Sequence, residues 1–186
     1  SLSEIYNYYG DVHKVEIISK QLLEDPNTDS VSDLTKSIIS CQLINSLDAQ
    51  HKYLEAIEYF NDCYFFTEDV VDNGTVHLSY KLQESILLAK INKIDIAKKN
   101  YSIIKNDISQ YYENEVVFDH SQIMSLDASL NYYLGDNKKS ISLFEIIEKR
   151  INENKTLVVD NTLIFAVDYL KVLRKVGNNE KALQVA

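Results

Sequence analysis

The sequence reads Leu-Gly-Asp-Asn-Lys-Lys-Ser at residues 134–140, and Phe144 follows four residues later. Similar phrases occur at 176–182, Val-Gly-Asn-Asn-Glu-Lys-Ala, and at 9–15, Tyr-Gly-Asp-Val-His-Lys-Val, with weaker versions at 50–56 and 91–97. The residues that align at the centre of these phrases are Gly10, His51, Asn92, Gly135 and Gly177, spaced by 41, 41, 43 and 42 residues. A near-constant period of this length is typical of proteins built from repeated helical units.

The repeated phrase has the properties needed to join two helices directly. Glycine and asparagine readily adopt the left-handed conformation that ends many helices, and Asp or Asn after them favours the start of the next helix. Five residues after each turn the side chain is small or modest in size, which lets two helices approach closely. These residues are Val15, Ala56, Ala97, Ser140 and Ala182. In the three central units an aromatic residue follows on the same helix face: Phe60, Tyr101 and Phe144.

The pattern predicts an all-α chain of helical hairpins. We expect first helices at about 31–47, 75–91, 118–134 and 157–176, and second helices at about 11–24, 50–67, 93–112 and 136–152. Pro26 comes just after one of these helices, where it prevents the helix from continuing. No linker or change in composition interrupts the chain, so residues 1–186 are expected to form one domain. The phase of the repeat suggests that the chain is a piece of a longer protein.

Composition narrows the classes of function. The chain has 186 residues with four glycines and one proline, too few chain breakers for a turn-rich β protein. Its net charge of −9 without a basic stripe argues against direct contact with nucleic acid. No apolar run is long enough to cross a membrane. Cys41 and Cys63 lack metal-ligand spacing and are interpreted as small apolar residues on helix faces, with a disulfide between them left open.

The phrases resemble the tetratricopeptide repeat, whose hairpin carries a small residue in its first helix, Gly-Asp or Gly-Asn at the turn, and a small residue and an aromatic in its second helix. Ala128, Gly135, Asp136, Ser140 and Phe144 carry the match most fully. The resemblance implies an α-α superhelix, or solenoid, of about four to five hairpins. The period here is near 42 residues, whereas the usual tetratricopeptide unit has about 34. Long units of this kind are similar to those of bacterial transcriptional regulators, sensor kinases and peptide-pheromone receptors.

In tetratricopeptide arrays the first helices line a concave groove, and the resemblance implies candidate binding residues there. The amides of Gln42 and Gln83 occupy equivalent positions and are suited to bonding an extended peptide backbone. The full set consists of Gln42, Asn45, Gln83, Ser129, Tyr132, Asp168, Lys171 and Arg174. The carboxylate clamp of one tetratricopeptide family is not expected, because Cys41 replaces its lysine. The alternative interpretation is that these are ordinary solvent-facing helix residues.

No catalytic residues, metal site or cofactor are predicted, because the four histidines are scattered and no nucleophile or phosphate-loop motif occurs. The favoured function is a non-catalytic scaffold that binds a protein or peptide in a bacterial signalling protein, a transcriptional regulator or sensor kinase. Two alternatives are a receptor core for a short peptide signal and a structural helical adaptor in a large assembly. No nucleic-acid contact or membrane insertion is expected, a homodimer is left open, and the cytoplasm is favoured over the periplasm.

Overall fold

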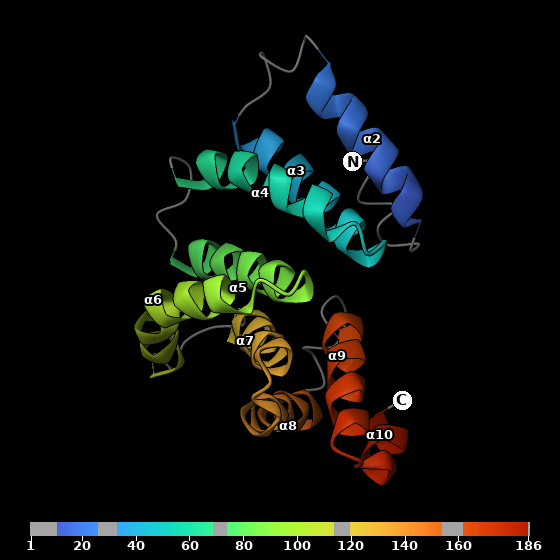
Figure 1. Ribbon diagram of the computed structural model, residues 1–186, viewed down its shortest axis with the longest axis vertical. Coiled ribbons are helices and arrows are strands. Elements are labelled where there is room, and N and C mark those ends of the chain that lie inside the picture. The colour runs from blue at the N-terminus through green and yellow to red at the C-terminus, as the bar shows by residue number, and fades with distance from the viewer. Residues whose placement is uncertain (1–10, 26–32, 69–73, 114–119, 154–161, 186) are drawn as a thin grey trace. The chain divides into compact units, whose positions relative to one another are not determined.

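The computed structural model describes residues 11–25, 33–68, 74–113, 120–153 and 162–185 (Figure 1). This part of the chain holds nine helices and no strand, which confirms the predicted all-α class. The helices are α2 (Val12–Glu24), α3 (Asp33–Ala49), α4 (Tyr53–Glu68), α5 (Gly74–Lys90), α6 (Ile94–Glu113), α7 (His120–Leu134), α8 (Asn137–Glu153), α9 (Thr162–Lys175) and α10 (Asn179–Val185). No helix within the described ranges is long and apolar enough to span a membrane.

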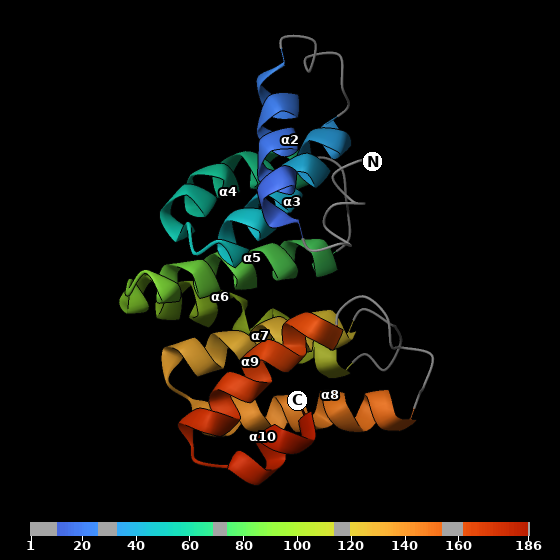
Figure 2. The ribbon, with the colours of Figure 1, turned by 90° about the vertical axis from the view of Figure 1, so that its right-hand side faces the viewer.

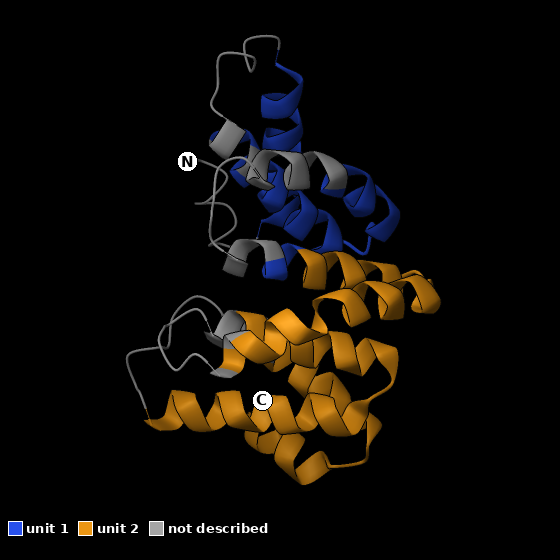
Figure 3. Ribbon diagram, turned by 90° about the vertical axis from the view of Figure 1, so that its left-hand side faces the viewer, with its two compact units in different colours: residues 1–80 blue, residues 81–186 orange. Residues whose placement is uncertain are grey.

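The chain divides into two compact units, Ser1–Tyr80 and Lys81–Ala186 (Figure 3). The boundary falls within α5, between Tyr80 and Lys81. The expectation of one domain over residues 1–186 stays a prediction.

Four turn residues have a left-handed backbone, at the positions that the repeat predicts. The φ angles are 62° at His51, 64° at Asn92, 91° at Gly135 and 80° at Gly177. Gly10, the fifth predicted turn residue, lies outside the described residues. Two of the four turns are therefore made by residues other than glycine, and asparagine is one of the few such residues that adopt this conformation at low cost.

The hydrogen bonds at each turn explain why no linker separates the two helices. At Gly135 the amide of Asp136 donates to the carbonyl of Asn131 at 2.9 Å, and the amide of Gly135 donates to Tyr132 at 3.1 Å. This pair of bonds is the Schellman motif, which satisfies the last carbonyls of α7. The carbonyl of Asp136 then accepts from the amide of Ser140 at 3.0 Å, so α8 begins at the residue that closes α7.

The same three bonds recur at the other described turns. The residue after each left-handed position donates back to the preceding helix and accepts from the following one: Lys52, Lys93 and Asn178. Where this residue is Asp or Asn, its side chain also caps the new helix. The Oδ1 atom of Asp136 accepts from the amide of Lys139 at 3.0 Å, and that of Asn178 accepts from Lys181 at 3.3 Å.

The small residue that follows each turn is buried, as the repeat predicts: Val15, Ala56, Ala97, Ser140 and Ala182. In unit 1, α3 packs against α2 and α4. In unit 2, successive helices from α6 to α10 pack against one another, and α7 also contacts α9 (Figures 1 and 2). The ring of Phe144 stacks on that of Tyr169 in the core, with centroids 5.1 Å apart. The repeated aromatic of α8 thus fills the space between consecutive hairpins.

The predicted helix limits differ from the observed ones by a few residues. The second helices α4 and α8 begin at Tyr53 and Asn137, slightly after the predicted starts at 50 and 136. Helix α3 covers Asp33–Ala49 and ends two residues after the predicted end at 47, while the predicted first residues 31 and 32 lie outside the described residues. These differences arise because the turn and cap residues have partly helical character, which the sequence pattern does not separate from the helix itself.

Replacing Gly135 by alanine tests the left-handed turn. A Cβ there meets no atom within 4 Å, so the cost is one of backbone conformation and not of space. We expect Gly135→Ala to lower the free energy of unfolding by about 1–2 kcal/mol. Asn92→Gly, at φ of 64°, is the matched opposite change and should leave stability equal or raised by a few tenths. Urea unfolding followed by circular dichroism measures both, and equal stability of Gly135→Ala and the unchanged chain would contradict the expectation.

Candidate functional site

The eight predicted binding residues fall in both units. Gln42 and Asn45 lie on α3 in unit 1, half-buried and exposed respectively. The other six lie in unit 2, where Gln83 is on α5, Ser129 and Tyr132 are on α7, and Asp168, Lys171 and Arg174 are on α9. The described contacts bring together Tyr132, Asp168 and Lys171 through one further residue, Tyr133.

One member of the predicted set does not face solvent. Ser129 is only 4% exposed, so the expectation of an accessible groove residue is wrong at this position. The reason is packing: α7 contacts α6, α8 and α9, and a small side chain allows close approach of neighbouring helices. Asp168 is also largely buried, at 9% exposed, but it has polar partners.

Helices α5, α7 and α9 together build a surface of tyrosine rings and basic side chains. We call it the tyrosine–lysine surface and define it by Lys90, Tyr132, Tyr133, Lys171, Arg174 and Lys175. The two tyrosine rings meet edge to face with centroids 4.9 Å apart. The Nζ atom of Lys90 lies 5.3 Å from the centroid of Tyr133, and that of Lys175 lies 4.9 Å from the centroid of Tyr132. Both distances are in the range of cation–π attraction.

Asp168 connects this surface to the body of α9. Its carboxylate pairs with the ammonium of Lys171, one helical turn away, at 2.8 Å. The same carboxylate accepts a hydrogen bond from the hydroxyl of Tyr133 at 3.3 Å. The ammonium of Lys171 also lies 3.4 Å from the same hydroxyl. Asp168, Lys171 and Tyr133 therefore hold one another in place across α7 and α9.

Three of the four basic residues of the surface lie at helix C-termini. Lys90 is in the last turn of α5, and Arg174 and Lys175 are in the last turn of α9. The negative end of the helix dipole favours cations there. That effect accounts for the lysines and arginine, but it does not account for the two tyrosines between them at the end of α7.

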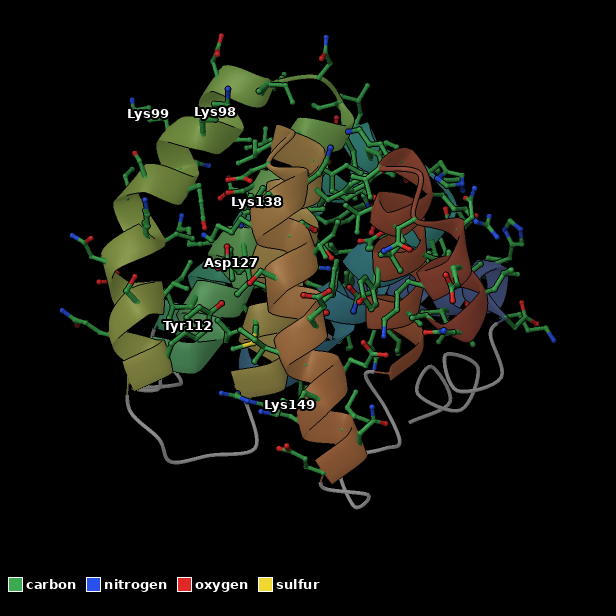
Figure 4. The ribbon with its side chains drawn as sticks, turned by 90° about the horizontal axis from the view of Figure 1, so that it is seen from below. Lys98, Lys99, Tyr112, Asp127, Lys138 and Lys149 are labelled. Carbon is green, nitrogen blue, oxygen red and sulfur yellow. The ribbon has the colours of Figure 1, made fainter. Side chains whose placement is uncertain are left out.

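A second polar cluster, centred on Asp127, was missed by the sequence interpretation. Asp127 is 1% exposed, and its Oδ1 accepts from the hydroxyl of Tyr101 at 2.5 Å and from Asn131 Nδ2 at 2.6 Å. Its Oδ2 accepts from the hydroxyl of Tyr112 at 3.0 Å (Figure 4) and lies 3.6 Å from Lys139 Nζ. These partners come from α6, α7 and α8, so one carboxylate links three helices. In the sequence, the one sign of this cluster was that an aspartate, Asp127, stands directly before the small residue Ala128 in an apolar helix.

The electrostatics of the two tyrosines follow from this burial. Loss of water raises the pKa of both Tyr101 and Tyr112 far above the ordinary value, and the charge of Asp127 raises it further. Both phenols therefore remain protonated donors at neutral pH. The ammonium of Lys139 contacts the Tyr101 hydroxyl and lies 5.0 Å from its ring centroid. A buried carboxylate with this number of partners is suited to fixing helix positions.

In unit 1 the corresponding polar cluster surrounds Glu16, which is 8% exposed. Its carboxylate accepts from Lys20 at 2.8 Å, from Lys52 at 2.7 Å and from Gln50 at 2.8 Å. Burial alone would raise the pKa of Glu16, but these hydrogen bonds outweigh it and lower the pKa from 4.5 to about 2. Lys20 also pairs with Glu55, and its partners raise its pKa. The cluster connects α2 to the α3–α4 turn and to α4.

No group of three or more His, Cys, Asp or Glu side chains within the described ranges is placed to hold a metal ion. Cys41 forms no disulfide, and its Sγ lies against the hydroxyl of Tyr80 on α5. The side chain of Cys63 is outside the described residues.

Removing the carboxylate of Asp127 tests the central cluster of unit 2. Asp127→Ala removes the carboxylate that accepts from two half-buried phenols and pairs with Lys139, and we expect a loss of about 3 kcal/mol in the free energy of unfolding. Tyr112→Phe, which removes one donor, should cost about 1 kcal/mol. The matched control is Asp107→Ala, because Asp107 is exposed on α6 and its removal should change stability by less than about 0.5 kcal/mol. Equal effects of the two aspartate variants in urea unfolding would refute the role of Asp127.

The lowered pKa of Glu16 predicts a loss of stability in acid. Above pH 4.5 the carboxylate is ionised in the folded and unfolded states, so its stabilisation is fully present. Between pH 4.5 and about 2 the unfolded state binds the proton first, and the stabilisation is lost. We expect the stability difference between the unchanged chain and Glu16→Gln to shrink by about 2–3 kcal/mol from pH 7 to pH 2.

Urea unfolding at a series of pH values measures this difference. The control is Glu58→Gln on the exposed face of α4, which should parallel the unchanged chain across the series. A constant difference between Glu16→Gln and the unchanged chain at all pH values would be inconsistent with the lowered pKa.

Comparison with known proteins gave no match to a protein-family model, to a curated protein or to a solved structure.

Proposed function

We propose that this chain is a non-catalytic repeat scaffold that binds a protein or peptide through its first helices. The observation that carries the proposal is the tyrosine–lysine surface. Its residues come from three successive hairpins and lie about one repeat apart in the sequence, yet Lys90, Tyr132, Tyr133 and Lys175 are in contact. Aromatic and arginine side chains are enriched in protein interfaces, where they supply contact area at modest entropic cost.

We further propose that the helical hairpins are arranged as a tetratricopeptide-like superhelix. Three features support it: left-handed turns spaced by 41, 43 and 42 residues, a small buried residue five positions after each turn, and the contact of first helix α7 with first helix α9. A stack of this kind is built from contacts between neighbouring repeats. A ligand that touches several first helices would change the angle between repeats.

The proposed context is a bacterial signalling protein, either a transcriptional regulator or a sensor kinase. The long period near 42 residues supports this context by resemblance. Ligand binding would favour one repeat spacing over another, and an output domain would respond to that shift. The sequence of the full gene tests the context: a DNA-binding or kinase segment beside this chain supports it, and an unrelated catalytic domain argues against it.

A receptor core for a short peptide signal would use the same first-helix surface with a smaller ligand. A structural adaptor would instead use the second helices, and one observation supports that alternative. On α6, Ile96 and Ile103 are 48% and 67% exposed and lie seven residues apart, on the same face of the helix. Exposed apolar residues in such a row are typical of contact surfaces in larger assemblies.

Selection from a random peptide library displayed on phage tests the proposed function. Peptides that bind the purified chain saturably are expected, and Tyr133→Ala should weaken them about tenfold, because it removes the ring that contacts Lys90 and Tyr132. Isothermal titration calorimetry gives the affinities, and circular dichroism establishes that the variant is folded.

Ile103→Glu on α6 is the matched control, since it alters an exposed second-helix residue in the same unit. It should leave the affinities unchanged. Peptides that lose binding with Ile103→Glu and keep it with Tyr133→Ala would favour the adaptor. Recovery of no peptide ligand would count against the scaffold and the receptor alike.

A further inference from the structure

The tyrosine–lysine surface is made by equivalent positions of the repeat. Lys90, Tyr133 and Lys175 each lie two residues before a left-handed turn residue, in three successive hairpins, and all three residues belong to unit 2. Tyr132 and Arg174 each lie three residues before one. The final turns of α5, α7 and α9 therefore present a row in which tyrosines lie between basic side chains.

The contacts hold the ammonium groups of this row in defined places. Lys90 lies over the ring of Tyr133, and Lys175 lies over the ring of Tyr132, at 5.3 and 4.9 Å. The tyrosine rings are in turn fixed against each other, and the hydroxyl of Tyr133 is fixed by Asp168. Lysine side chains normally lose much rotamer freedom when they bind a ligand, and prior ordering reduces that cost.

The charge of the surface is opposite to that of the chain. The chain carries −9, whereas this surface includes Lys90, Lys171, Arg174 and Lys175. Among the described contacts of these residues the one carboxylate is that of Asp168, which is largely buried and paired with Lys171. Arg174 and Lys175 are exposed, and neither makes an ion pair with a described residue. A partner that covers them must supply negative charge.

The chemistry favours carboxylates over a nucleic acid. Single-stranded nucleic acids bind to open aromatic faces, but an ammonium group already covers one face of Tyr132 and one face of Tyr133. The overall charge of −9 would also repel a long polyanion. Packed helices lie about 8–10 Å apart. An extended peptide in the polyproline II conformation rises about 3.1 Å per residue and has three residues per turn, so every third side chain faces the same way. Acidic residues three positions apart would thus match neighbouring helices.

We propose that the row formed by Lys90, Tyr132, Tyr133, Arg174 and Lys175 binds an extended acidic peptide segment, with its carboxylates on the basic side chains. The proposal rests on the proposed function and names the class of its ligand. Lys171 remains paired with Asp168 and positions Tyr133, so it acts on the ligand indirectly.

The experiment uses a fluorescently labelled peptide with glutamate at every third position and a counterpart in which glutamine replaces each glutamate. Fluorescence anisotropy with the whole chain should show saturable binding of the glutamate peptide, weakened by added salt, and binding of the glutamine peptide about tenfold weaker or less. The double variant Arg174→Glu, Lys175→Glu should lose about tenfold or more for the glutamate peptide.

The matched control is Lys98→Glu, Lys99→Glu, which changes the net charge equally at two exposed neighbours on α6 (Figure 4). The affinity of this control for the glutamate peptide should stay within about twofold of that of the unchanged chain, because Lys98 and Lys99 lie outside the proposed row. Tyr132→Leu removes the ring under Lys175 while keeping all charges, and should weaken the glutamate peptide by a few-fold. Circular dichroism and thermal unfolding establish that every variant is folded.

Four results would overturn the acidic-peptide assignment. One is equal binding of the glutamate and glutamine peptides, or no binding of either. Another is an equal loss in the two double variants. A third is tighter binding of a single-stranded oligonucleotide to the same residues. The fourth is self-association that the Arg174, Lys175 variant abolishes, since the partner would then be a second copy.

The outcome for the proposed function is separate. Some library-selected peptides could bind the Arg174→Glu, Lys175→Glu variant as tightly as they bind the unchanged chain. That result would contradict the assignment of an acidic peptide as the ligand and would still support a peptide-binding scaffold. Failure of every library and designed peptide would remove both.

Discussion

The turn that joins two helices without a linker is the constraint on which the rest of the structure depends. One residue donates its amide to the helix that ends and accepts at its carbonyl from the helix that begins: Lys52, Lys93, Asp136 and Asn178. Because the preceding residue is left-handed, the chain reverses within a few residues. The direction of the second helix is therefore set by backbone hydrogen bonds, and any side chain that permits positive φ allows the turn.

Side-chain packing then holds the two helices of each hairpin together. A buried small residue after each turn lets the two helices of a hairpin approach, and larger side chains such as Phe144 and Tyr169 fill the space beyond it. Apolar contacts are nearly non-directional, so they stabilise a hairpin pair without specifying one position. The buried carboxylate of Asp127 supplies direction, because its hydrogen bonds are satisfied only when α6, α7 and α8 are correctly placed. In unit 1 the carboxylate of Glu16 links α2 to the α3–α4 turn in a similar way, through Gln50 and Lys52.

The candidate surface is a consequence of repetition. A regular period places the last turns of α5, α7 and α9 in equivalent positions, so side chains distant in sequence meet as neighbours. Helix dipoles favour cations at these ends. The two tyrosine rings of α7 each contact one of these ammonium groups, which fixes the positions of Lys90 and Lys175. Under the proposed function, a ligand on this row would contact several hairpins at once, and this shared contact would couple recognition to a change in repeat spacing.

The sequence by itself determined the helical class, the hairpin turns and the small buried residues, because each depends on a few neighbouring residues and recurs at a fixed period. Tyr132, Asp168 and Lys171 were also predicted for the site from their place in the repeat. Only the tertiary structure decided that Ser129 is buried, that Asp127 has partners on three helices, and that Tyr133, Lys90 and Lys175 belong to the surface. These outcomes depend on side chains from helices that are far apart in the chain. Periodicity predicts which face a residue occupies, but the contact across two helices is set by their packing.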